Sequence, residues 1–293
     1  MVVLIGSDGF IGNHVKRWAE SLNVKHIGVY FEDAQKGEMS FEEYLKSDVL
    51  SKTKTLIITA GNSDHKLPRE NFLSALQKDL KYLESLEKSN VSADIVFLSS
   101  AAVYYGYKGY VDECTKVEPV DYYGLSKLYS EYMVRFLAKK HDKRLLIFRL
   151  TNAFGINQKR KRFFDNILDC LKSQNTFKVI GMGESYMNPL HVEKVGEIIF
   201  KSAINIDKIV KKNESEIVNL GSLAPHRVID IVKYISEKYG LKFEHVGEEE
   251  YLVEFITDTK KLVKILDTIA VKIEPLYDDV DRLLQTFLKG EKK

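Results

Sequence analysis

Tyr123 and Lys127 stand four residues apart in the segment DYYGLSKLYSE, where a helical pattern begins that runs to about Lys140. Residues four apart share one face of a helix, so the phenol and the ammonium are expected to be neighbours. A nearby cation favours the phenolate and lowers a tyrosine pKa from about 10, which suits the side chain to proton transfer. The alternative is a surface tyrosine and a solvated lysine that share a helix face without any chemistry.

A glycine-rich turn, GSDGFIGN, follows the first apolar run and places Gly6, Gly9 and Gly12 at GxxGxxG spacing. In dinucleotide sites such glycines make the tight turn, let the backbone approach a pyrophosphate and let the helix pack on the strand. Amide groups at the helix N-terminus bind the phosphates, so Phe10 and Ile11 are expected contacts. A turn without a ligand is the alternative, because a glycine pattern alone is weak evidence. The position between a strand and a helix favours the dinucleotide.

Strand-length apolar runs alternate with helical patterns through the first half of the chain. The runs lie at 2–6, 25–31, 55–61, 94–100 and 144–150. Such alternation indicates an α/β fold with a parallel sheet covered on both faces, which binds ligands beyond the carboxyl ends of its strands. Ala60 and Gly61, at the end of the third run, are therefore expected cofactor contacts.

The pattern changes after Gly155, where shorter strands and helices are mixed. We therefore expect a Rossmann-type, doubly wound parallel sheet over residues 1–155. A smaller mixed α/β lobe, over residues 156–293, would bind the substrate, with some crossing of the chain between the two parts.

The composition argues against several classes of protein. Forty-four basic and 42 acidic residues give a net charge of +2, which offers no attraction for nucleic acid or an anionic membrane. The two cysteines form no CxxC motif and the histidines show no metal spacing, so neither a disulfide framework nor a metal site is expected. The apolar runs are far shorter than a membrane span of about 20 residues, and no signal-peptide pattern precedes the first. The sequence predicts a cytoplasmic protein.

The second strand should end near an acidic residue that binds the adenosine ribose of NAD. At the expected place, near Tyr30, the sequence reads YFED, so Glu32 and Asp33 are the candidates, although they are displaced. No adjacent arginine favours a 2′-phosphate. NAD is preferred on this ground, and NADP is not excluded.

Further segments extend the pattern along the chain. SSAAVYYG ends the fourth strand, and RLTNAFG (149–155) and NPLHVEKVGE (188–197) follow the tyrosine helix. Together with YGLSK they resemble, in order, the SSxxVYG, YGxSK, RxxNxxG and HVxDV segments of the extended short-chain dehydrogenase/reductase superfamily. That branch, the NAD-dependent epimerases and dehydratases, acts largely on nucleotide sugars. The resemblance covers most of the chain.

The resemblance implies roles for individual residues. Tyr123 would exchange the proton at a sugar oxygen, and Lys127 would stabilise the phenolate and reach the nicotinamide ribose. Ser100, rather than Ser99, would hydrogen-bond the reacting oxygen. Asn152 would position substrate or cofactor, although a strand-end turn residue is the alternative. The family also implies a homodimer, in which the helices at 72–89 and 123–140 pair into a four-helix bundle.

Two departures from the family pattern concern the substrate. Alanines follow the two serines where 4,6-dehydratases of the family carry an Asp-Glu pair, which argues against 4,6-dehydration. Met187 stands where an arginine often binds the nucleotide diphosphate. The charge would then come from Arg160 or Arg162 in QKRKRFF, for which a solvated basic loop is the alternative, or from Arg227, a weaker candidate.

On this resemblance we expect an NAD(P)-dependent oxidoreductase that acts on a nucleotide-activated sugar, most simply an epimerase working through a transient keto sugar. One alternative is a nucleotide-sugar 4-ketoreductase or dehydrogenase. Another, of a different class, is a non-catalytic dinucleotide-binding sensor or scaffold, against which the retention of Tyr123 and Lys127 argues. The sequence identifies neither the sugar nor the nucleotide.

Overall fold

The central sheet has seven parallel strands in the order β12–β7–β5–β4–β1–β2–β3. The structure is a computed structural model, and it describes residues 1–34, 37–61, 69–156, 158, 161–248 and 253–290. The strands are β1 (Val2–Ile5), β2 (His26–Tyr30), β3 (Met39–Ser40), β4 (Thr55–Ile58), β5 (Asp94–Ser100), β7 (Leu145–Leu150) and β12 (Ser215–Leu220). From β1 the chain winds outward through β2 and β3, then returns to β4 on the other side of β1. This reversal opens a crevice at the carboxyl ends of β1 and β4, the usual ligand site of such sheets. The expected doubly wound α/β fold is confirmed.

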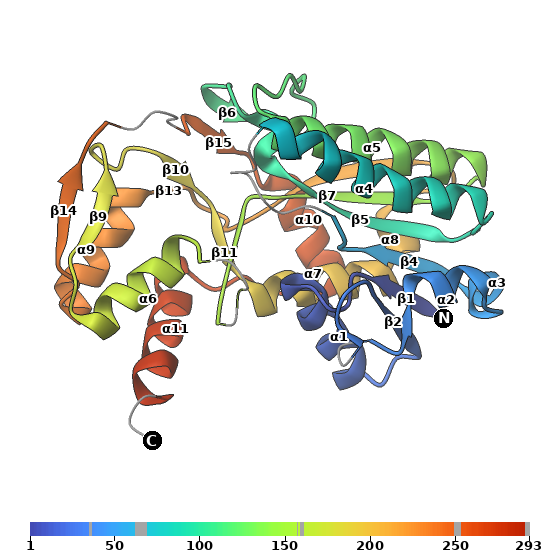
Figure 1. The fold of residues 1–293 in the computed structure, drawn as a ribbon, viewed down its shortest axis with the longest axis horizontal. Coiled ribbons are helices and arrows are strands. Elements are labelled where there is room, and N and C mark those ends of the chain that lie inside the picture. Colours follow the sequence, from blue (N-terminus) through green and yellow to red (C-terminus); the bar gives the residue numbers. More distant parts are fainter. Residues whose placement is uncertain (35–36, 62–68, 157, 159–160, 249–252, 291–293) are drawn as a thin grey trace.

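Helices cover both faces of the sheet (Figure 1). They are α1 (Phe10–Ser21), α2 (Phe41–Lys46), α3 (Val49–Lys52), α4 (Arg69–Lys88), α5 (Tyr122–Lys140), α6 (Phe163–Ser173), α7 (Val192–Ile204), α8 (Ile206–Ile209), α9 (Val228–Tyr239), α10 (Lys260–Ile269) and α11 (Leu276–Gly290). Helices α4 and α5 lie side by side on one face, whereas α1 and α7 pack together on the other. Within the described residues, no helix is long and apolar enough to cross a membrane. The expected cytoplasmic location stays a prediction.

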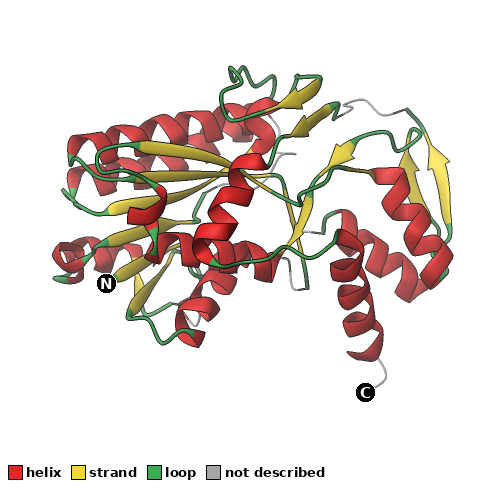
Figure 2. Cartoon of the chain, turned by 180° about the vertical axis from the view of Figure 1, so that it is seen from behind, coloured by secondary structure: helices red, strands yellow, loops and turns green. Residues whose placement is uncertain are grey.

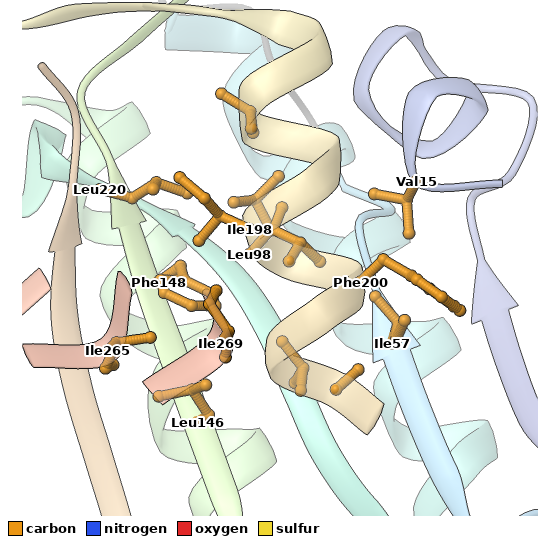
Figure 3. Packing of buried hydrophobic residues seen from close by; sticks show 14 of the residues in the cluster. Val15, Ile57, Leu98, Leu146, Phe148, Ile198, Phe200, Leu220, Ile265 and Ile269 are labelled. Carbon is orange, nitrogen blue, oxygen red and sulfur yellow. The ribbon is translucent and has the colours of Figure 1, made fainter. Parts of the chain in front are cut away.

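The alternating side chains of the strands build two cores. In β1, Val2 and Leu4 face the α1–α7 side, whereas Val3 and Ile5 face the α4–α5 side. Figure 3 shows the first core, in which Ile198 of α7 lies over the strands. A strand buried on both faces has a continuous apolar sequence, which is why the runs identified above are unbroken.

Helices α6, α9 and α11 gather in the smaller lobe (Figure 2), and their side chains form a separate core. Outside the central sheet, short strands form two-stranded pairs. They are β6 (Gly109–Val111) with β15 (Phe255–Thr257), β8 (Asn152–Phe154) with β11 (Pro189–His191), β9 (Phe177–Ile180) with β14 (Phe243–Val246), and β10 (Tyr186–Met187) with β13 (His226–Arg227). Met187, at the expected arginine position, is partly buried and packs against this core.

The second half of the chain also contributes to the central sheet. Strand β12 pairs with β7, and α7 covers the same sheet beside α1. An apolar strand followed by a helix has the same pattern in either part, so the sequence did not show which sheet this strand joins. The polypeptide thus crosses between the two parts, and the division at residue 155 stays a prediction.

Candidate active site

A cavity of about 760 Å³ extends over the carboxyl ends of five neighbouring strands. The residues at or just beyond these ends that line it are Gly6 after β1, Phe31 after β2, Ala60 after β4, Ser100 of β5 and Leu150 of β7. Helices α4 and α5 and the segment around Arg162 complete its walls. The cavity therefore lies at the crevice that the strand order creates.

The glycine turn forms the floor of this cavity beside β1. Gly6 has φ +89°, which favours glycine, and a Cβ on Gly12 would lie only 1.9 Å from the Gly6 carbonyl oxygen. A Cβ on Gly9 would meet only that oxygen, at 3.3 Å, so this position faces open space. Gly9 precedes α1, whose first amides have no side-chain cap among the described residues. The turn therefore fits a bound pyrophosphate, because these amides are available to a ligand.

Acidic groups gather where the turn meets the end of β2. The carboxylate of Asp8 accepts hydrogen bonds from the backbone amides of Glu32, at 3.0 Å, and of Asp33, at 3.4 Å. Asp8 and Glu32 line the cavity, whereas Asp33 does not. Sequence reasoning missed Asp8, although its place within the glycine turn was a usable signal. Glu38, farther along the chain, accepts from the amide of Gly28.

The two serines at the end of β5 have different partners. The Ser99 hydroxyl donates to the buried carboxylate of Glu131, at 2.7 Å. The Ser100 oxygen accepts from the amide of Ala102, at 3.2 Å, and so caps the 3-10 helix that follows β5. A hydroxyl that accepts in this way still has a proton to donate. Both serines line the cavity, but Ser100 is the one with its hydrogen available for a ligand.

Helix α5 presents Tyr123 and Lys127 to the same cavity. Asp121 caps the helix by accepting from the amide of Gly124, at 2.7 Å. Gly124 packs against the 3-10 helix, since a Cβ there would lie 2.4 Å from the Ala102 carbonyl oxygen. Both reactive side chains are buried, and the Lys127 Nζ lies 5.5 Å from the centre of the Tyr123 ring. The sequence-predicted trio therefore shares one cavity wall.

A buried ion pair supports this wall from behind. Arg149 of β7 and Glu131 of α5 are 3% and 1% exposed in their side chains, and two hydrogen bonds of 2.9 and 3.0 Å join them. Burial alone would lower the pKa of Arg149, but the hydrogen bonds and charge of Glu131 raise it above its ordinary value. Arg149 also donates to the hydroxyl of Tyr104, at 2.8 Å. Glu131 thus ties α5 to β7 through Arg149 and to β5 through Ser99.

Of the remaining residues predicted to bind the substrate, some line the cavity and others lie outside it. Arg162 lines the cavity, and Gln158 lies beside it. Asn152 is half-buried in β8 and does not line it. Arg227 lies outside it and pairs with Asp230, at 3.2 Å. Arg160 lies outside the described residues.

Helix α4 contributes a wall that sequence reasoning missed. Ser74, Lys78, Asp79 and Tyr82 line the cavity. Residues 74, 78 and 82 follow an i, i+4, i+8 spacing, which was a usable signal of one shared face. Asp79 is buried close to Lys127, since a Cβ on Gly61 would contact both the lysine Nζ, at 3.0 Å, and an aspartate oxygen, at 3.5 Å.

Comparison with known proteins places this architecture in a class. The model of the NAD dependent epimerase/dehydratase family matches residues 2–221. The chain belongs to this family, as its resemblance to the extended short-chain dehydrogenases implied.

A curated relative and two solved structures are similar to the chain. An Escherichia coli O157:H7 enzyme, N-acetyl-alpha-D-glucosaminyl-diphospho-ditrans,octacis-undecaprenol 4-epimerase, is 28% identical over 209 residues, 68% of this chain and 61% of the relative. The match thus spans about three fifths of that relative. A UDP-glucose-4-epimerase structure from Stenotrophomonas maltophila, with NAD and formylated UDP-arabinopyranose, has a TM-score of 0.83 at 16% identity, covering 99% of this chain and 98% of that one. A structure of the Bacillus cereus UDP-glucuronic acid 4-epimerase, with UDP-glucuronic acid and NAD, has a TM-score of 0.79 at 15% identity and covers 99% of each chain.

Proposed function

We propose that this protein is an NAD-dependent 4-epimerase of a nucleotide-activated sugar, working through a transient 4-keto sugar. The observation that carries the proposal is one cavity lined by a pyrophosphate-type glycine turn and by Ser100, Tyr123 and Lys127. The curated relative and both structures described above are named 4-epimerases, which supports this reaction over others of the family.

Each residue of the trio has a chemical task in this proposal. When bound, NAD supplies the acceptor and donor of the hydride that leaves and rejoins the sugar carbon. Tyr123 takes the hydroxyl proton as the ketone forms and returns it as the hydroxyl is restored on the other face. Lys127 places a positive charge beside the phenolate oxygen, and Ser100 donates a hydrogen bond to the reacting oxygen.

Two other reactions are less well supported. Dehydration would need an acid and a base beside the sugar, and Ala101 and Ala102 stand where the family's dehydratases carry carboxyl groups. A 4-ketoreductase would use the same trio, and it differs in releasing its cofactor after each turnover. A sensor without turnover would not need Tyr123 and Lys127 buried together in the cavity.

For the cofactor we propose NAD rather than NADP. The carboxylates of Asp8 and Glu32 line the cavity at the end of β2, where the adenosine ribose is expected. Their negative charge would repel the 2′-phosphate of NADP. Calorimetry should therefore show tighter binding of NAD, and equal binding of the two cofactors would refute this assignment.

For the substrate we propose that Arg162 binds the diphosphate. It lines the cavity on the side of the smaller lobe, whereas Met187 and Arg227 do not line it. Guanidinium groups pair well with phosphate oxygens because their donors form a fixed fork. Arg162→Met should raise KM for the nucleotide sugar with little change in NAD affinity, and an unchanged KM would exclude this role.

We also propose a homodimer through α4 and α5. Tyr132 and Phe136 on α5 are 60% and 57% exposed, and Leu73 on α4 is 62% exposed. An apolar surface of this kind on paired helices is suited to a four-helix interface. Light scattering should give twice the 33.7 kDa chain mass, and Phe136→Asp should shift the protein toward monomer. A monomeric wild type would refute the proposal.

The direct test of function is incubation of the purified protein with UDP-hexoses, UDP-N-acetylhexosamines and UDP-hexuronic acids, followed by chromatography. The proposal predicts interconversion of one pair of C4 epimers without net consumption of NAD. A product that accumulates only with stoichiometric oxidation of added NADH would instead identify a ketoreductase. Binding of NAD without conversion of any of these sugars would favour a sensor.

A further inference from the structure

The cavity extends well beyond the reactive trio. Along the sheet order the trio lies beside β5, the glycine turn lies in the middle beside β1, and Phe31 and Glu32 lie at the β2 end. A dinucleotide whose pyrophosphate rests on the turn and whose nicotinamide lies near Lys127 must direct its adenosine toward β2. The side chains at that end therefore decide how the adenine is held.

Phe31 is the aromatic side chain placed to do this. It follows β2 directly, lines the cavity and is 43% exposed, although large aromatic rings are usually buried. Its ring stacks on that of Phe41, with centroids 5.0 Å apart and planes at 24°. Tyr82 of α4, which also lines the cavity, contacts Phe31 edge to face at 5.7 Å.

The surrounding contacts hold Phe31 in place before any ligand binds. Phe41 and Tyr82 are buried, and the Tyr82 hydroxyl donates to the Ala60 carbonyl oxygen, at 3.2 Å. The amide of the next residue, Glu32, is bound by the Asp8 carboxylate, which anchors the backbone to the glycine turn. A ring fixed in this way loses little conformational freedom when a second ring stacks on it.

We infer that Phe31 is the stacking platform for the adenine ring of the dinucleotide, an inference that rests on the proposed NAD-dependent function. Among the described residues, the region between β2 and β4 holds the two-residue strand β3 and the short helices α2 and α3. Glu38 in this region binds Gly28 and Lys16 instead of lining the cavity. The adenine is thus held by an aromatic face, and the neighbouring Glu32 lies at the strand end where the ribose is expected.

Equilibrium binding tests the inference without using turnover. Phe31→Ala should weaken ADP-ribose and NAD by about 5- to 100-fold, the range typical of one base stacked on one aromatic ring. Nicotinamide mononucleotide lacks the adenine, so its affinity should change less than about twofold on the same reasoning. Phe31→Tyr keeps the ring and should bind all three ligands like the wild type.

Matched variants separate stacking from disturbance of the fold. Phe31→Leu keeps apolar bulk without a ring face and should resemble Phe31→Ala in ADP-ribose binding. Tyr110→Ala removes a ring that is 80% exposed on β6, outside the cavity, and should leave all affinities unchanged. In NMR spectra, the H2 and H8 protons of AMP should shift upfield with wild type and not with Phe31→Leu, since ring currents act above an aromatic face.

The outcomes separate this inference from the proposed function. Wild type that binds NAD, with Phe31→Ala binding ADP-ribose equally well, would overturn the role of Phe31 alone. Equal weakening of ADP-ribose and nicotinamide mononucleotide would also overturn it, because the loss would then be general. Wild type that binds neither NAD nor ADP-ribose would overturn the dinucleotide site itself.

Discussion

Lys127 holds its ammonium 5.5 Å from the centre of the Tyr123 ring, and both side chains are buried in the wall of one cavity. One helical turn separates them, so their relative position depends on a single helix. That helix is capped by Asp121, packed on the turn after β5 through Gly124, and tied to β7 by Glu131. The proposed chemistry depends on this arrangement, and the predictions below test its parts.

Tyr123→Phe should lower kcat by about 10²- to 10⁴-fold or more, because it removes the group that moves the proton. NAD affinity should stay close to that of the wild type, since the ring and its packing are retained. Steady-state assays and calorimetry measure the two quantities. Tyr129→Phe, an exposed tyrosine of the same helix, is the matched control and should be fully active. Retained turnover in Tyr123→Phe would remove Tyr123 from the mechanism.

Two substitutions in the glycine turn should separate its role in folding from its role in NAD binding. Gly12→Ala would place a Cβ 1.9 Å from the Gly6 carbonyl oxygen, so the protein should be strongly destabilised. Gly9→Ala meets its nearest atom at 3.3 Å and has φ −75°, so it should fold. Its methyl group would nevertheless obstruct the approach of the pyrophosphate and weaken NAD binding. Thermal unfolding and calorimetry distinguish these effects; normal NAD affinity in Gly9→Ala would contradict the assignment of the turn.

Arg149→Met should cost about 3–5 kcal/mol of unfolding free energy, because it leaves the Glu131 carboxylate buried without its cation. Arg227→Met breaks a solvent-screened surface pair with Asp230 and should change the unfolding free energy far less. Urea denaturation of both variants makes the comparison. Equal losses would mean that the buried pair has no special part in holding α5 on the sheet.

Asp121→Ala should lower the unfolding free energy by about 1 kcal/mol, since it removes the cap of α5, while Asp121→Asn keeps the cap. Burial raises the pKa of the Asp121 carboxyl despite its hydrogen bond from Gly124. A raised native pKa means that stability is fully present at low pH and falls as pH rises through that pKa. The stability of Asp121→Asn relative to wild type should therefore increase from about pH 3 to pH 7. A relative stability that decreases over this range would contradict the burial of the charged group.

Local sequence patterns predicted the parts of the site that are built locally. The glycine turn needs only a strand, a turn and a helix, and Tyr123 and Lys127 need only helical spacing, so each could be located from the sequence. Ser100 was identified through the family resemblance; it lines the cavity, and its role stays a prediction. Whether these residues act as proposed is a question for the variants above.

Features that depend on tertiary placement were not predictable in the same way. Strand β12 has an ordinary apolar sequence, and only the fold places it beside β7. Phe31 follows an apolar strand, where a phenylalanine usually packs into a core, so its exposure in the cavity had no sequence signal. Asp79 lies on α4, and its burial near Lys127 follows from the contact between α4 and α5, which the sequence of one helix does not show.

The central claim is that a hydride leaves C4 of the sugar and returns to the same carbon within one active site. Incubation of the protein with a nucleotide sugar deuterated at C4, in the presence of unlabelled NADH, tests it most directly by mass spectrometry of both epimers. For an epimerase that retains its cofactor, the product epimer should keep its deuterium and no label should appear in the free NADH pool. Loss of deuterium from the epimer, or its transfer to free NADH, would contradict an epimerase that retains its cofactor.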